Sequence, residues 1–443
     1  MPIQQMLLGF DDLHSFADLD TFSQNIPVEW VESALQLTAK ASIRRRRLPP
    51  EQVLWLVVGM AMFRHEPIGE VVRRLNICAD GLANEALLAR SGLSEARQRL
   101  GDQSLEWLFK RTGQHWGAER YPQDDWHGLQ VFAVDGALFR TPDTPELREH
   151  FGSGNTSSQR QTAFPMMRLV ALMNVRSHVI LNAQLSPYRR SEMRLAETFT
   201  AQIPDHSVTL FDKGFWGADL LLTINRTGDQ RHWLIPERRG LVYEEVEAYS
   251  EHDRLLRMKV SAQARKRNPE LPETWNVRAV SYEVNGKLKT VFTSLPAKQF
   301  STAQVAALYQ ERWEIELGFR DIKSSMQHNA ITLRSKKVEL IYQEVWGMLL
   351  AYNVIRREAS QAAVSYGRSP CDIRFKPACQ FIAAQLIVMA AAQPASRTGA
   401  RLSELRAGVA SLFLDDRPRQ STPRTVKISK TRYPVDRKAA PLK

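Results

Sequence analysis

Two aspartates stand where sheet proteins often place reactive side chains. Asp135 follows the apolar run VFAV and Asp212 follows TLF, and both runs are typical of buried strands. A side chain at a strand end emerges beside a loop, where it is accessible to a substrate. An Asp at a strand end is also an ordinary turn signal, so these two positions are only suggestive of chemistry.

The segment YQERWEIELGFRDIK, at positions 309–323, adds a third carboxylate. With about 100° per residue in a helix, four polar side chains fall within about 60° of one another: Tyr309, Arg312, Glu316 and Lys323. An adjacent apolar face is predicted to pack on a sheet: Leu308, Ile315, Phe319 and Ile322. A solvated amphipathic helix with ion pairs has the same pattern, and helical geometry alone favours that simpler interpretation.

Phosphodiester chemistry gives these groups a reason to belong together. Cleavage needs an activated water and a stabilised leaving oxygen, which two Mg²⁺ ions about 3.5–4 Å apart provide in nucleases and polymerases. Mg²⁺ prefers carboxylate oxygens, so Asp135, Asp212 and Glu316 would be a sufficient set of ligands. Cations on the helix would then hold DNA phosphates in line with the metal ions.

The bulk composition agrees with a protein that binds a polyanion. The 443 residues predict about two to four domains, and the 43% hydrophobic content is ordinary for a globular protein. The net charge of +12 favours nucleic acid as a partner, because Lys and Arg release counterions when they neutralise phosphates. The N-terminus has no signal-peptide pattern and the longest apolar run, 53–63, is too short to cross a bilayer. A cytoplasmic, nucleoid-associated protein is expected.

The first 128 residues are predicted to be mostly helical. Helices are expected at 51–63, 68–76 and 93–111, with Ser94 capping the third. They carry arginines that are expected to point outward: Arg73, Arg74, Arg97 and Arg99. This resembles a helix-turn-helix arrangement, and a plain helical bundle with a basic face explains it equally well.

Two strongly basic segments lie outside these helices. One is the run Arg44, Arg45, Arg46 and Arg47, which is either solvated or lies along DNA phosphates. The other is the last 27 residues, with nine Lys or Arg and one Asp. This tail is predicted to be flexible, and either contacts DNA or keeps the protein soluble.

From about residue 129 the pattern changes to short apolar strands. They are predicted at 129–136, 167–175, 178–186, 208–214 and 232–238, with a helix at 191–203. This order indicates a sheet with helices on its faces. A β-rich insertion is expected at 237–298, where Asn285-Gly286 signals a tight hairpin. Helices are predicted again from Thr302 to about Lys323 and at about 337–359.

Other classes of DNA enzyme fit poorly. The three cysteines (Cys78, Cys371 and Cys379) have no zinc or disulfide spacing and are interpreted as packed or idle thiols. The ten histidines are scattered, which argues against a zinc-dependent nuclease. None has Arg three residues further on, so a recombinase with a covalent tyrosine and a His-x-x-Arg element is rejected.

The motif Tyr-x2-Arg-x3-Glu-x6-Lys, filled by Tyr309, Arg312, Glu316 and Lys323, resembles the signature of insertion-sequence-4 type DDE transposases. Other segments also look like this family, and the resemblance covers about 44–356: RRRRLPPEQVLWLVVGMA, EARQRLG, VDGALFRTPDTPE, LFDKGF, HWLIPER and LRSKKVELIYQEVWGMLLAYNVIR. A four-residue motif matched at every spacing is a specific signal.

The resemblance implies an α/β fold with a ribonuclease-H-like catalytic core. Asp135, Asp212 and Glu316 would bind two Mg²⁺ ions, for which Mn²⁺ could substitute. The family moves DNA by cut-and-paste, often through a hairpin on the transposon end. The motif's tyrosine and two cations would hold the DNA backbone at that end.

The resemblance also implies domains and partners. The expected division is an end-binding domain at 1–128, the catalytic core at 129–236 and 299–390, the insertion at 237–298 and the basic tail at 391–443. The partners would be double-stranded DNA, as terminal inverted repeats and target, and a second copy of the chain. Relatives stack a flipped base on an aromatic of the insertion. Trp275 and Phe292 are the candidates, although each is more simply interpreted as core.

A catalytically silent, transposase-derived DNA-binding regulator is the competing hypothesis. The intact triad and motif argue against it. A regulator would bind DNA unchanged without Mg²⁺, whereas the enzyme would lose cleavage.

Overall fold

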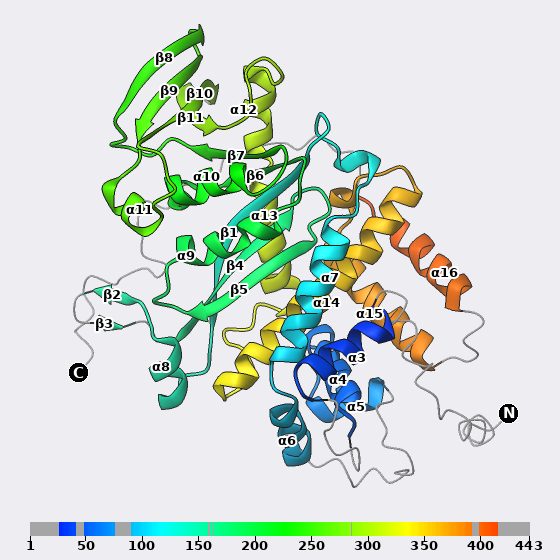
Figure 1. The fold of residues 1–443 in the computed structure, drawn as a ribbon. Helices are drawn as coiled ribbons and strands as arrows, with labels where there is room; N and C mark the ends of the chain where they lie inside the picture. Colours follow the sequence, from blue (N-terminus) through cyan, green and yellow to red (C-terminus); the bar gives the residue numbers. More distant parts are fainter. Residues whose placement is uncertain are drawn as a thin grey trace, which may run out of the picture. The chain divides into compact units, whose positions relative to one another are not determined.

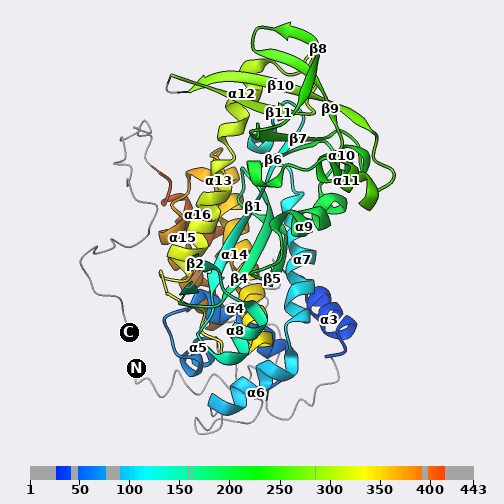
Figure 2. The same ribbon diagram turned by 90° about the vertical axis from the view of Figure 1, so that its left-hand side faces the viewer.

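Nine strands among the described residues form one mixed sheet (Figures 1 and 2). The computed structural model describes residues 26–40, 48–75, 90–157, 160–161, 163–284, 286–391 and 398–414. The strand order is β5-β4-β1-β6-β7-β11-β10-β9-β8. These strands are β1 (Gln130–Arg140), β4 (Met166–Asn174), β5 (Ile180–Pro187), β6 (Ser207–Phe211), β7 (Arg231–Pro236), β8 (Tyr243–Ser250), β9 (Asp253–Lys259), β10 (Thr274–Val284) and β11 (Lys287–Thr293). A separate small pair joins β2 (Asn155–Ser157) and β3 (Arg160–Gln161).

Helices surround the sheet and make up most of the described residues before β1 and after β11. The α-helices are α3 (Val28–Leu37), α4 (Pro50–Met62), α5 (Ile68–Arg74), α6 (Arg90–Leu100), α7 (Gln103–Gly117), α8 (Pro145–Phe151), α9 (Glu192–Ala196), α10 (Ala218–Arg226), α11 (Ala262–Arg267), α12 (Thr302–Gln310), α13 (Trp313–Arg320), α14 (Val338–Ser365), α15 (Phe375–Ala391) and α16 (Thr398–Ala410). Shorter turns of helix are η3 (Pro122–Asp124), η4 (Glu197–Gln202), η5 (Lys213–Phe215), η6 (Asp321–Met326) and η7 (Pro370–Asp372). None of the described helices combines the length and apolarity that a bilayer crossing requires.

The strand β1 is the centre of the half of the sheet that carries Asp135 and Asp212. On one side it pairs antiparallel with β4, which pairs antiparallel with β5. On the other side it runs parallel to β6, and β6 runs parallel to β7. An antiparallel meander followed by two parallel strands is the ribonuclease-H-like core that the resemblance implies. The five predicted strands are present in the predicted order, although β1 continues to Arg140, past its predicted end.

Alternation along β1 divides the apolar interior into two cores. Val131 and Ala133 belong to the core beneath α7, α13 and α14, whereas Phe132 and Val134 belong to the core beneath α9 and α10. Successive side chains of a strand point to opposite faces. The next residue, Asp135, therefore falls on the face that α13 covers.

The predicted helix from Thr302 to Lys323 is interrupted. The first part, α12, ends at Gln310 and α13 begins at Trp313, with a turn between them. The helix then widens to π-helical hydrogen bonding in η6, which contains Lys323. The predicted apolar face is nevertheless buried in full: Leu308, Ile315, Phe319 and Ile322.

The N-terminal helices agree with the sequence in part. The 51–63 and 68–76 predictions correspond to α4 and α5. The predicted 93–111 helix is instead two helices, because Gly101 adopts a φ of +70° that no helix continues through. Ser94 lies inside α6 and caps nothing.

Arg97 corrects the prediction of an outward basic face. It is 5% exposed, and its guanidinium donates to Gln343 at 2.9 Å and Ser335 at 3.1 Å. Arg73, Arg74 and Arg99 are exposed as expected, but Arg73 is ion-paired with Glu70 and Arg74 with Glu66. Only part of the predicted basic face is therefore available to a partner.

The β-rich segment continues the core sheet. β11 pairs antiparallel with β7, with Phe292 opposite Ile235, and β10, β9 and β8 follow outward, as Figure 1 shows. The predicted hairpin is present, with Val284 opposite Lys287 and Gly286 at a φ of +70°. Every residue of β8, the outermost strand, is exposed.

Candidate active site

The register between β1 and β6 brings Asp135 and Asp212 together. Their parallel ladder ends with Val134 opposite Phe211, and the next residue of each strand is an aspartate. Asp212 follows the end of β6, where its carboxylate accepts a hydrogen bond from the Gly214 amide at 3.3 Å.

Asp135 does not end its strand, contrary to the sequence prediction. β1 continues to Arg140 and remains paired with β4, with Asp135 opposite Ala171. The Asp–Gly pair is therefore not a turn. It marks the point at which β1 extends beyond its neighbour β6, which leaves the Asp135 side chain room beside the sheet.

Arg312 connects Glu316 to Asp135. Its Nη2 donates to Glu316 Oε1 at 2.6 Å, and its Nη1 lies 3.6 Å from Asp135 Oδ2. The side chains of Arg312 and Asp135 are 15% and 21% exposed, so this contact is largely screened from solvent. The structure thus brings the three carboxylates and Arg312 to one face of β1.

The electrostatics of Asp135 show the effect of this crowding. Burial raises its pKa to about 6, and the neighbouring charges of Glu316 and Asp212 act in the same direction. The Gly136 amide and Arg312 oppose the shift. Burial also lowers the pKa of Arg312, but Glu316, Tyr309 and Asp135 outweigh it and the net shift is upward.

Tyr309 and Lys323 lie at the two ends of this arrangement. The Tyr309 hydroxyl donates to the carbonyl of Phe211 at 3.3 Å, which ties α12 to the residue before Asp212. Burial raises the pKa of Tyr309, so its hydroxyl stays protonated. Lys323 Nζ lies 5.6 Å from the centre of the Phe139 ring on β1. Both motif residues therefore flank the carboxylates.

Of the remaining predicted residues, the structure describes only Trp275 and Phe292, and it places both in the core. Arg44, Arg45, Arg46 and Arg47 lie outside the described residues. Trp275 is 7% exposed and Phe292 is fully buried, and both rings pack against Trp216. Their interpretation as core residues fits this packing.

Trp313 is a residue that sequence reasoning missed. It is the first residue of α13, immediately after Arg312, and it is 51% exposed. A large aromatic on the surface beside half-buried charges is unusual in a residue with only a packing role. Its place inside the motif was the signal that could have identified it.

The donor set fits a hard divalent cation. Three carboxylates supply only oxygen atoms, the ligand type that Mg²⁺ and Mn²⁺ accept. The raised pKa of Asp135 reflects like charges that a divalent cation would offset. Arg312 also offsets part of this negative charge, since its guanidinium contacts two of the three carboxylates.

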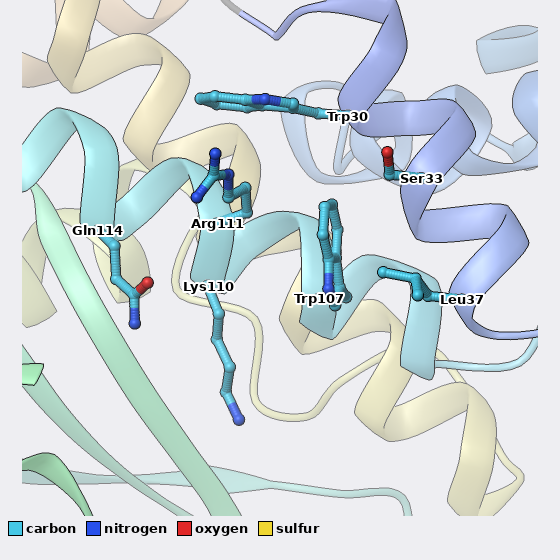
Figure 3. Close-up of a pocket in the computed structure, with 7 residues that line it drawn as sticks. All are labelled: Trp30, Ser33, Leu37, Trp107, Lys110, Arg111 and Gln114. Carbon is cyan, nitrogen blue, oxygen red and sulfur yellow. The ribbon is translucent and has the colours of Figure 1, made fainter. Parts of the chain in front are cut away.

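A second feature is an open pocket between α3 and α7, far along the sequence from the triad (Figure 3). Its volume is about 540 Å³, and it is lined by Trp30, Ser33, Leu37, Trp107, Lys110, Arg111 and Gln114. The Arg111 guanidinium lies 5.0 Å from the centre of the Trp30 ring. Aromatic faces beside cations are the surface type that stacks bases and holds phosphates.

Two protein-family models match this chain, one in its N-terminal part and one in its central part. The family model of the transposase DDE domain matches residues 126–354, and that of the insertion element 4 transposase N-terminal region matches residues 16–110. The transposase InsG for insertion sequence element IS4 of Escherichia coli K12 is 36% identical over 94% of each chain. InsZ of the same organism is 54% identical over 56% of this chain and 82% of its own.

Among solved structures, the piggyBac transposase in a synaptic complex with hairpin DNA is similar, with a TM-score of 0.43 and 11% identity. The match covers 91% of this chain and 87% of that one. The sequence matches by themselves span nearly the whole molecule, including every strand of the half of the sheet that carries Asp135 and Asp212. The chain belongs to the insertion-sequence-4 family of DDE transposases, enzymes that use divalent metal ions to cut DNA and join its strands.

Proposed function

We propose that this protein excises and reinserts an insertion element by a cut-and-paste reaction, with Asp135, Asp212 and Glu316 as the catalytic metal ligands. The observation that carries the proposal is the β1–β6 register, which sets two aspartates side by side on the face covered by the helix of Glu316. Three carboxylates from three elements on one face have no packing role that apolar residues would not serve better.

The preferred metal is Mg²⁺, with Mn²⁺ as a substitute. Two bound ions would supply an activated water or hydroxyl for attack and would stabilise the leaving oxygen. Asp135 and Asp212 would hold the ions from the sheet, and Glu316 would hold them from α13. The Arg312 side chain must yield part of its contact with Asp135 and Glu316 as the ions enter.

The other motif residues would position the DNA. Once released from the carboxylates, Arg312 can donate two parallel hydrogen bonds to a phosphate. Lys323, on the same side of β1, would neutralise a neighbouring phosphate. Tyr309 would hold the end of β6, and with it Asp212, in place through its hydrogen bond to the Phe211 carbonyl. Trp313 would stack on a base that the DNA end leaves unpaired, which suits a hairpin intermediate.

The N-terminal helices would recognise the terminal inverted repeats. The support is the basic, tryptophan-lined pocket between α3 and α7 and the match to the family's N-terminal region. Two copies of the chain would hold the two ends and the target in one complex within the nucleoid. A silent regulator is the less favoured function, because the complete triad and its supporting contacts would serve no purpose in it.

The test is excision from a supercoiled plasmid that carries the element's own inverted repeats. Wild type is compared with Glu316→Gln, and with Glu149→Gln on the exposed face of α8 as a matched control. With Mg²⁺ we expect excision by wild type and the control, and a loss of excision activity of more than about 100-fold in Glu316→Gln. Loss of a residue that only orients a metal ligand lowers activity about 10- to 100-fold, and loss of the ligand itself should lower it further. End binding measured by gel shift should survive.

The other outcomes are equally informative. If all three proteins bind the ends and none cuts, the protein is a DNA-binding regulator. If Glu316→Gln cuts as fast as wild type, the assigned triad is wrong. Gel analysis of the excised ends under denaturing conditions separates hairpin from open ends and so tests the intermediate.

A further inference from the structure

Three side chains with metal-binding chemistry meet at a second place, outside the carboxylate triad. His178 comes from the turn between β4 and β5, Glu314 from α13 and Cys371 from η7. His178 Nε2 lies 2.9 Å from Glu314 Oε2 and 3.5 Å from Cys371 Sγ. Their ligand atoms all lie within 4.8 Å of one another, and among the described residues no other three such side chains do so.

One imidazole nitrogen, His178 Nε2, faces both of the other groups. The thiol and the carboxylate approach the same imidazole nitrogen, and one N–H can be directed at only one of them. A cation between the three groups would be bound by all of them at once.

The distances agree with a tetrahedral zinc-type centre. With Zn–S of about 2.3 Å and Zn–N and Zn–O of about 2.0–2.1 Å, the tetrahedral separations are about 3.6 Å for S and N and about 3.4 Å for N and O. The observed 3.5 Å matches the sulfur–nitrogen separation, and the 2.9 Å His178–Glu314 contact would widen slightly. The ligand atoms of Glu314 and Cys371 lie within 4.8 Å of each other and would settle about 3.6 Å apart. The side chains of His178 and Glu314 are 5% and 16% exposed, so the site is enclosed but reachable.

We propose that His178, Glu314 and Cys371 bind a thiophilic divalent cation such as Zn²⁺, with water in the fourth position. Binding converts the Cys371 thiol to a thiolate, and its proton passes to solvent. The hydrogen bond from this thiol to the Arg176 carbonyl, at 3.3 Å, is lost in exchange for the metal–sulfur bond. A sulfur and nitrogen donor set separates this site from the all-oxygen triad, which selects harder ions.

The site would fix the helix that carries Glu316. Glu314 is two residues before it on α13, whereas His178 belongs to the sheet and Cys371 to the C-terminal helical part. His178 has a φ of +60°, a left-handed conformation that strains a residue other than glycine. A bound cation would compensate for that strain and hold α13 against the β4–β5 turn.

The experiment is a Co²⁺ titration of the whole protein with Mg²⁺ in excess, so that the triad is occupied. We expect one Co²⁺ per chain to produce a near-ultraviolet charge-transfer band from thiolate to metal. Cys371→Ser should remove the band, whereas Cys379→Ser and Cys78→Ser should retain it. A band that survives Cys371→Ser, or its absence from wild type, overturns the proposal.

A second measurement needs no substitution. Zn²⁺ should slow alkylation of Cys371 by iodoacetamide at least tenfold, as read by mass spectrometry, with the rate at Cys78 as the internal reference. Equal slowing at both cysteines means general stabilisation, and no slowing means no site; both results overturn the proposal. Neither assay depends on DNA cleavage, so failure here leaves the function of the triad standing.

Discussion

Asp135 lies in surroundings that disfavour its charged form when no metal ion is bound. Burial and two neighbouring carboxylates raise its pKa to about 6, although Arg312 and the Gly136 amide counteract them. In the unfolded chain the same carboxyl ionises near its ordinary value of 3.8. Its charge therefore destabilises the native state in full above pH 6, less between pH 6 and 4, and not at all below about pH 4.

Asp135→Asn should for this reason stabilise the metal-free protein. Asn keeps an oxygen for the Gly136 amide and removes the charge, so the free energy of unfolding at pH 8 should rise by about 1–3 kcal/mol. The gain should vanish near pH 4. Denaturant unfolding with a chelator present measures it, with exposed Asp229→Asn as the control. A loss of stability at pH 8 would mean that the contact with Arg312 outweighs burial.

Lys323→Gln should weaken DNA binding without changing which sequence is bound. If Lys323 neutralises one phosphate, its loss lowers the slope of log affinity against log salt by about one. The measurement is fluorescence anisotropy with end DNA and with unrelated DNA across a salt series. An unchanged slope, or a change confined to end DNA, would contradict a phosphate contact.

At the scale of elements, the sequence pattern predicted the helices, strands and turns that depend mainly on neighbouring residues. The apolar runs correspond to β4, β5, β6 and β7, and the Asn285-Gly286 signal corresponds to the β10–β11 hairpin. The helix from 93 to 111 was divided wrongly, because apolar spacing continues through Gly101 although the backbone turns there. Similarly, the helical spacing of apolar residues continues through the turn between α12 and α13 and does not reveal it.

Long-range contacts account for what the sequence could not reveal about the sites. The motif identified residue types, but the contact of Arg312 with Asp135 depends on how α13 packs on β1. Arg97 is buried only because Gln343 and Ser335 accept its hydrogen bonds from distant parts of the chain. Likewise, 193 residues separate His178 from Cys371, so no spacing pattern could link them.

Substitutions at two glycines test how closely α7 packs on β5. A Cβ at Gly113 would lie 2.6 Å from the backbone oxygens of Ile180 and Leu181, so Gly113→Ala must push the helix off the strand. We expect a loss of about 3 kcal/mol or more in the free energy of unfolding. Gly69→Ala, with open space around it in α5, should be neutral or stabilising by up to about 1 kcal/mol. Comparable losses in both would show that α7 does not pack this closely.

At the scale of the whole molecule, positive charge is unevenly distributed along the chain. The last 27 residues contain nine Lys or Arg and one Asp, out of a net charge of +12 for the protein. The outermost strand, β8, is acidic by contrast and includes Glu244, Glu245 and Glu247. Charge of this kind steers DNA to the protein and sets the salt dependence of binding.

Removal of residues 417–443 should reduce affinity for DNA of any sequence. The expected effect is a loss of at least about tenfold at low salt, a shallower salt dependence and little change in end specificity. Gel shifts with end DNA and unrelated DNA at several salt concentrations measure all three. If affinity is unchanged but the truncated protein precipitates, the tail serves solubility instead.

The pairing of β11 with β7 has a consequence for how such enzymes diversify. Because the inserted strands are added in register to the margin of the catalytic sheet, their hydrogen bonds continue it outward and leave β1 and β6 undisturbed. Hairpins could be gained or lost beyond β8 over evolution, one pair at a time, while the reacting groups keep their places. Relatives with longer or shorter insertions should accordingly differ at this outer margin and share the same aspartate-bearing strands.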